Sequence, residues 1–209
     1  IDFENPAAPI VKKVNFDFTQ TGYALVITDT GGSHANLNEE YASIPREMKS
    51  VASALGSKVL REVSMEKVLQ AMPGLREKVG DRALLRAIHF QADNARVVDQ
   101  VNALENNNFS DFLKMVTGSG FSSYMYNQNI FPVIDITHQG VALGLALSHL
   151  VLDGKGAFRV HGGGFAGTIQ AFVPQNLLDQ YVVALEHVFG IGACHKLFIR
   201  DKGAIKVEL

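Results

Sequence analysis

The chain has 209 residues, of which 47% are hydrophobic, so it holds ample material for a packed core and is not a disordered or fibrous sequence. Its formal charge is −2 and its basic residues are scattered, which argues against a nucleic-acid partner or an anionic membrane surface. The longest apolar run, which starts at Gly140, is too short to span a bilayer. Cys194 is the only cysteine, so no intramolecular disulfide can form, and the sequence predicts a cytoplasmic protein.

The first thirty or so residues alternate apolar and polar side chains, which is typical of β-strands. Residues 1–5 are strand-like, Val14, Phe16 and Phe18 would share one face of a strand, and a further strand is expected over residues 22–30. A sheet is therefore expected to start near the N-terminus.

The middle of the chain has helical periodicity. The expected helices are one over residues 37–55 with a break or kink at Pro45, a short one capped by Ser64 and closed by Pro73, a long one over residues 81–105, and two more over residues 109–127 and 132–150.

Strand patterns return after Gly156. Strands are expected over residues 156–161, 168–174 and 195–199 and again near the end of the chain, with a helix over residues 175–190. Strands at both ends and helices between them predict an α+β fold, with a mostly antiparallel sheet packed by a helical layer. No linker composition marks a boundary, so residues 1–209 are expected to form one domain.

The stretch AFRVHGGGFAGTIQAFVP, from Ala157 to Pro174, is unusually rich in glycine. It contains G-x-G-x-x-G, but β-branched and aromatic residues follow it where a dinucleotide-binding loop would open a helix. Two interpretations remain from the residues alone. The loop is either a tight crossing at which glycine lets two elements touch, or a nest of backbone N–H groups near a phosphate.

This stretch resembles the C-terminal glycine motif of galactokinases, R-M-T-G-G-G-F-G-G, within the GHMP small-molecule kinase superfamily. The chain departs from the motif at His161 and Ala166. It keeps Arg159, Gly162, Gly163, Gly164, Phe165 and Gly167.

Two further segments are similar to galactokinases in the same order. His34, Leu37 and Tyr41 match H-x-L-x-x-x-x-Y, and the segment around Asp93 resembles the family's E-N-x-R-V with Asp in place of Glu. The family's S-H-x-S-L-R-D-x-Y is replaced by SGFSSYMYNQN, in which the Arg-Asp pair is lost and Tyr126 would take the tyrosine position. This departure leaves the preferred sugar open.

The resemblance implies a ferredoxin-like C-terminal domain of the GHMP kinase type, with residues 1–20 as the tail of a missing N-terminal domain or its hinge. In the family, the sugar-binding signature, the phosphate loop and the catalytic Asp all precede the segment that this chain resembles. No catalytic residue and no metal ligand is therefore expected in the chain itself.

The resemblance also implies an activity for the full-length protein, namely transfer of the ATP γ-phosphoryl group, with Mg²⁺, to the C1 hydroxyl of galactose. The chain alone is expected to be inactive and, with an apolar N-terminal edge, to self-associate. The alternatives are a kinase for a related sugar such as N-acetylgalactosamine or a sugar acid, a non-catalytic regulator that binds galactose and ATP, and a stand-alone interaction module.

The implied site residues fall into three groups. Tyr41 would reach the sugar, with a core tyrosine as the alternative. His34 would order its loop, and His161 would touch nucleotide phosphate or cap the turn. The residues expected to support the phosphate loop of the missing domain are Gly162, Gly163, Gly164, Phe165, Ala166 and Gly167.

Overall fold

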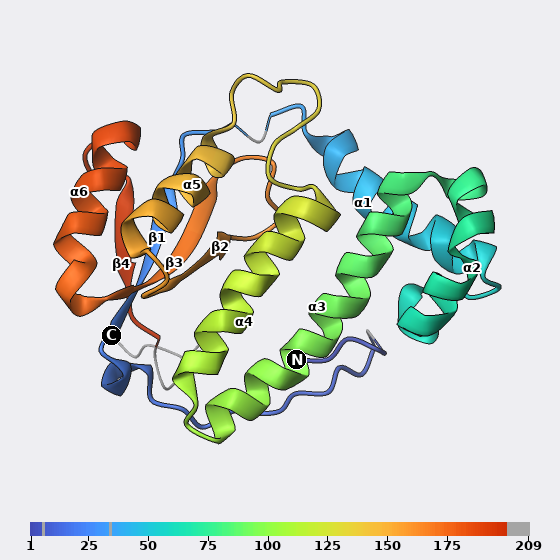
Figure 1. Cartoon of the computed structure of the whole chain (residues 1–209), viewed down its shortest axis with the longest axis horizontal. Coiled ribbons are helices and arrows are strands. Elements are labelled where there is room, and N and C mark those ends of the chain that lie inside the picture. The colour runs from blue at the N-terminus through green and yellow to red at the C-terminus, as the bar shows by residue number, and fades with distance from the viewer. Residues whose placement is uncertain (6, 34, 200–209) are drawn as a thin grey trace, which may run out of the picture.

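The structure is a computed structural model that describes residues 1–5, 7–33 and 35–199. In this part of the chain, four strands form one sheet, and every neighbouring pair is antiparallel. The strands are β1 (Tyr23–Asp29), β2 (Ala157–Val160), β3 (Thr168–Pro174) and β4 (Cys194–Leu197). Their order across the sheet is β2-β3-β1-β4, so the first strand of the chain lies in the middle of the sheet (Figure 1).

Two of the helices that lie between these strands in the chain cover one face of the sheet, and the other α-helices are inserted between β1 and the first of these two. Helix α5 (Gly140–Leu152) leads into β2, and α6 (Leu178–Phe189) lies between β3 and β4, which gives the split β-α-β-β-α-β order of ferredoxin-like domains. The main core lies between these helices and the strands. Its largest fully buried members include Val26, Ile130, Val141, Leu152, Val160, Ile169, Val173, Tyr181 and Leu185.

Helix α4 (Phe109–Ser122) packs against β2 and the other face of the sheet. Leu113 and Val116 join Ala157 and Phe172 in a second buried cluster. Gly120 permits this approach, because a Cβ at that position would lie 2.7 Å from the carbonyl oxygen of Phe158. A π-helical turn, Ser123–Asn127, extends α4.

Three helices form a further layer on the far side of α4 from the sheet. They are α1 (Asn38–Ala54), α2 (Met65–Val79) and α3 (Asp81–Glu105), and Figure 1 shows α2 at the opposite end of the molecule from α6. Val51, Val68, Leu75 and Leu84 contribute to their own buried cluster, and the Ser64 hydroxyl caps α2 by accepting from the Lys67 N–H at 3.2 Å. Short 3₁₀ turns lie at Phe18–Thr21, Leu60–Glu62 and Gln175–Leu177.

The predicted fold class is confirmed, since the domain is α+β with an antiparallel sheet packed by helices. The long helix α3 has the predicted bounds, and the four principal strands lie where the sequence indicates. The expected strand at residues 204–209 lies outside the described residues. No helix in the described ranges is both long and apolar enough to cross a bilayer.

Four predictions about elements are wrong. Residues 14–17 form no strand, because the rings of Phe16 and Phe18 pack against Phe109. Helix α2 continues through Pro73 to Val79, because Leu75 buries its side chain beyond the proline. The helix expected from residue 132 begins only at Gly140.

That helix starts late because the Asp135 side chain accepts hydrogen bonds from the backbone just before Gly140. Its Oδ1 accepts from the N–H groups of Thr137 and His138 at 3.1 and 3.2 Å, which fixes a turn in place of a helix. At the N-terminus, residues 1–5 contribute only a single bridge between Asp2 and Ile10 rather than a strand.

Candidate functional site

The glycine-rich segment forms the connection between β2 and β3. Its base is closed by His161, whose N–H donates to the Thr168 carbonyl at 3.0 Å and whose Nδ1 lies 3.0 Å from the Thr168 hydroxyl. The geometry of His161 is therefore that of a residue that caps the turn. Positive φ angles recur along the loop at Gly162 (74°), Gly164 (82°), Phe165 (61°) and Gly167 (85°).

Asn129, which follows the π-helical turn, supports the loop from below. Its carbonyl oxygen accepts from the Phe165 N–H at 2.6 Å, and its Nδ2 donates to the Gly163 carbonyl at 3.1 Å. A Cβ on Gly164 would lie 2.0 Å from the Asn129 carbonyl oxygen, so no other residue fits there without displacing one of the two segments. Asn129 was not among the expected site residues, since nothing in its local sequence pattern marks it.

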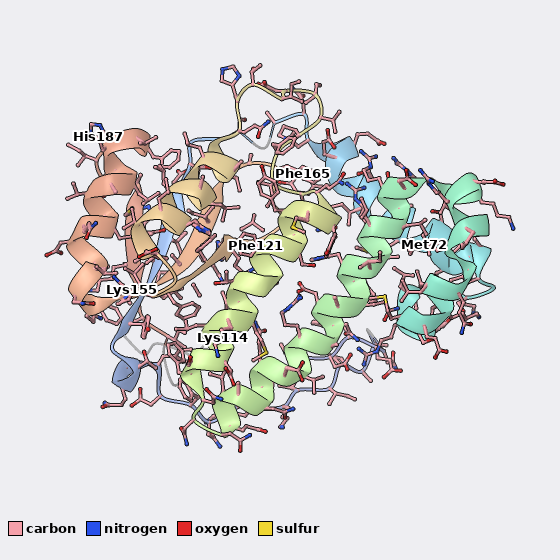
Figure 2. All side chains as sticks on the ribbon, in the orientation of Figure 1. Met72, Lys114, Phe121, Lys155, Phe165 and His187 are labelled. Atoms are coloured by element: carbon pink, nitrogen blue, oxygen red, sulfur yellow. The ribbon has the colours of Figure 1, made fainter. Side chains whose placement is uncertain are left out.

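Tyr41, on the first turn of α1, holds the loop from the side. Its hydroxyl donates to the Gly164 carbonyl at 2.9 Å, and its ring meets Phe165 edge-on, with ring centroids 5.3 Å apart. Burial raises the pKa of Tyr41. Leu37, Phe165 and Ala166 form a small buried cluster against this ring, and in Figure 2 Phe165 lies beside the start of α1.

The end of β1 fixes the far side of the loop. Thr30 donates twice to the Gly167 carbonyl, from its hydroxyl at 2.6 Å and from its N–H at 2.9 Å. A Cβ on Gly32 would lie 2.9 Å from the Cβ of Ala166, so the backbone after β1 passes directly over that side chain. The alanine that departs from the family motif is thus accommodated by a glycine on the opposing segment.

The loop is exposed on its first residues and buried on its last. His161, Gly162 and Gly163 are exposed, whereas Gly164, Phe165 and Ala166 are buried. In the described part of the chain, the N–H groups of Gly162 and Gly163 donate to no other residue. The expected site residues therefore meet at one place: Tyr41 and the glycine loop are in direct contact. His34 lies outside the described residues.

The third sequence motif forms a separate polar cluster between α3 and α4. Asp93 is ion-paired with Arg96 and accepts from the Ser119 hydroxyl at 3.0 Å. His89 Nδ1 lies 2.9 Å from the Ser122 hydroxyl, and burial lowers the pKa of His89. Burial also lowers the pKa of Arg159, which lies on β2 just before the glycine loop.

The described residues contain no group of three or more His, Cys, Asp or Glu side chains placed to hold a metal ion.

No protein-family model matches the chain. It is 30% identical over 156 residues to a galactokinase of Haemophilus influenzae, covering 75% of this chain and 38% of that protein. It is 28% identical over 169 residues to a galactokinase of Actinobacillus pleuropneumoniae, covering 79% and 42%.

A solved structure has a similar fold. The crystal structure of Lactococcus lactis galactokinase complexed with galactose matches with a TM-score of 0.59 at 18% identity, covering 90% of this chain and 47% of that one. The four-stranded antiparallel sheet and its covering helices give the chain the same α+β fold as that structure. By sequence the chain is a homologue of galactokinases, and it spans about two fifths of the length of the curated relatives it matches.

Proposed function

We propose that the chain is the C-terminal domain of a sugar kinase that transfers the γ-phosphoryl group of ATP to the C1 hydroxyl of galactose. The observation that carries this proposal is the sequence match to galactokinases over three quarters of the chain. The contact between Tyr41 and the glycine loop supports it, because these two motif segments are 123 residues apart in the sequence and meet in the fold.

In this proposal the chain positions substrates and the preceding domain supplies the catalytic carboxylate. Phosphoryl transfer depends mainly on positioning and charge stabilisation, and Mg²⁺, when bound, neutralises phosphate charge. Tyr41 would offer its flat ring to a pyranose face. The exposed N–H groups of Gly162 and Gly163 would face the phosphate loop of the preceding domain, and the rigid supports below them would hold that geometry.

The test uses the full-length protein with ATP, Mg²⁺ and galactose, and follows formation of galactose 1-phosphate. Wild type should turn over, and Gly164→Val should abolish turnover while circular dichroism still reports a folded sheet. Tyr41→Leu, which removes the aromatic ring, should raise the KM for the sugar more than the KM for ATP. The 209-residue chain alone should be inactive; enzyme-like turnover by it, with host galactokinase excluded, would contradict this division of labour.

A related sugar is the second candidate substrate. The segment that replaces the family's Arg-Asp motif forms the end of α4 and the π-helical turn Ser123–Asn127, so the departure changes a structured element. We infer that specificity differs there, and the same assay run with N-acetylgalactosamine and galacturonic acid ranks the alternatives by kcat/KM. Binding of galactose and ATP by calorimetry without turnover of any sugar would indicate a non-catalytic regulator.

Two accompanying proposals concern location and assembly. We infer a cytoplasmic protein, to be checked by fractionation. Ile1 and Phe3 are 76% and 62% exposed, so the isolated chain is expected to self-associate through this edge. Sedimentation at increasing concentration tests this, and a monomer at all concentrations would contradict it.

A further inference from the structure

Arg86 is a buried cation in α3, with only 1% of its side chain exposed. A buried guanidinium is costly unless carboxylates and carbonyls satisfy it. Its Nη1 donates to the Ser43 hydroxyl at 2.8 Å and to Glu47 Oε2 at 2.9 Å, both on α1. Its Nε donates to the Asn127 carbonyl at 3.1 Å, at the end of the π-helical turn.

The two segments that Arg86 joins are those that support the glycine loop. Ser43 lies half a turn beyond Tyr41 on α1, and Asn127 lies just before Asn129. Tyr41 bonds to the Gly164 carbonyl, and Asn129 bonds to the backbone on both sides of that residue. The planar guanidinium group of Arg86 thus fixes the distance between α1, which carries Tyr41, and the π-helical turn, which leads to Asn129.

We propose that Arg86 is a positioning residue for the candidate site. It holds α1 and the π-helical turn in fixed relative positions, so that Tyr41 and Asn129 can both hydrogen-bond to the glycine loop. The positioning role rests on the contacts above, and its effect on sugar phosphorylation rests on the proposed function. A guanidinium suits this task because its donors point in fixed directions, whereas a lysine ammonium is a point charge on a flexible stem.

The surroundings of Arg86 provide a matched control. Arg82 lies one helical turn earlier on α3 and pairs with the same carboxylate, its Nη2 lying 2.5 Å from Glu47 Oε1. It is 41% exposed, and among the described residues it donates only to Glu47. Removing Arg82 therefore weakens the ion pair between α1 and α3 but leaves the link to Asn127 in place.

The experiment is hydrogen exchange read by mass spectrometry on the complete protein without substrate. In Arg86→Met, the peptide covering residues 161–168 should exchange about tenfold faster than in wild type, and peptides from α6 should be unchanged. Arg82→Met should leave the loop peptide within about twofold of wild type. Arg86→Lys should give an intermediate value, because the charge remains but the fork is lost.

Equal loop exchange in Arg82→Met and Arg86→Met would overturn the proposal, since a general weakening of α1–α3 packing would then explain both. If Arg86→Met does not fold, Ser43→Ala can be used instead, because it removes one hydrogen-bond acceptor of the Arg86 guanidinium at small cost. Hydrogen exchange in the peptide covering residues 161–168 should still become faster in this variant, and unchanged exchange would overturn the proposal. Kinetics separate the two claims. Arg86→Lys should raise the sugar KM several-fold with kcat nearly retained, and a complete protein that phosphorylates no sugar refutes the proposed function while the exchange result stands.

Discussion

Replacing Gly164 by alanine tests the geometry on which the candidate site depends. The φ of Gly164 is 82°, and its new Cβ would lie 2.0 Å from the Asn129 carbonyl oxygen. A side chain at positive φ costs about 1–2 kcal/mol. The clash also forces Asn129 away from Phe165 and breaks their hydrogen bond, which leaves a buried carbonyl unsatisfied at a further cost of about 1–3 kcal/mol.

Gly162→Ala is the matched control in the same loop. Gly162 has a φ of 74°, and nothing lies within 4 Å of the position of its Cβ, so only the conformational cost of about 1–2 kcal/mol applies. Urea denaturation of both variants measures the difference. For a chain of this size each 1 kcal/mol lowers the Tm by about 2–4 °C, so a thermal scan should show Gly164→Ala several degrees below Gly162→Ala.

Equal losses of stability in the two variants would refute the reasoning. That result would mean that the loop moves away from Asn129 without cost, and the contact would then not be what fixes the loop. Hydrogen exchange at residues 161–168 gives an independent reading, because only Gly164→Ala should accelerate it.

Three other predictions concern packing and pH. Gly120→Ala should lower the free energy of unfolding by about 1–3 kcal/mol, because α4 contacts β2 at this position. Gly74→Ala should raise it by about 0.5–1 kcal/mol, because a Cβ at this position of α2 meets no other atom. Urea denaturation of the two variants should show these opposite signs. Burial raises the pKa of Tyr181 to about 12, so the folded protein keeps a proton that the unfolded chain loses near pH 10. The free energy of unfolding should then fall as pH rises from about 10 to 12, and a Tyr181→Phe variant with the same slope would contradict this. Because burial lowers the pKa of His89, the unfolded chain binds a proton at a higher pH than the folded protein does. The free energy of unfolding should therefore fall as pH drops below about 6.5. Chemical denaturation at pH 7.5 and 5.5 should show a smaller fall in His89→Gln.

The parts of the fold that the sequence predicts correctly are those set by local pattern. Helix α3 has a sustained apolar stripe and a glycine before it, and strand β3 has β-branched residues between a glycine loop and a proline. The errors arise where tertiary contacts override local signals. Pro73 lacks only one donor, and burial of Leu75 outweighs that loss, so the helix continues.

The candidate site was predictable only in part. The glycine loop and Tyr41 are recognisable as motifs, but their contact depends on how α1 is placed against the loop between β2 and β3, which no local pattern encodes. Asn129 contributes a backbone carbonyl, which any residue has, and a single side-chain amide bond, so its local sequence does not mark its role. Arg86 had a signal that could have been used: it is a charged residue within the apolar run ALLRAIHF, which indicates a buried cation in need of partners.

The central position of β1 has a consequence for how the protein is made. Its partner β3 follows roughly 140 residues later, and β4 later still. At about 5–20 residues per second, a ribosome needs on the order of 7–30 s to synthesise that interval. During that time β1 is apolar and has neither of its partner strands to pair with. The nascent chain is therefore exposed to aggregation, and its yield in cells should depend on chaperones that shield this strand until β3 and β4 have been synthesised.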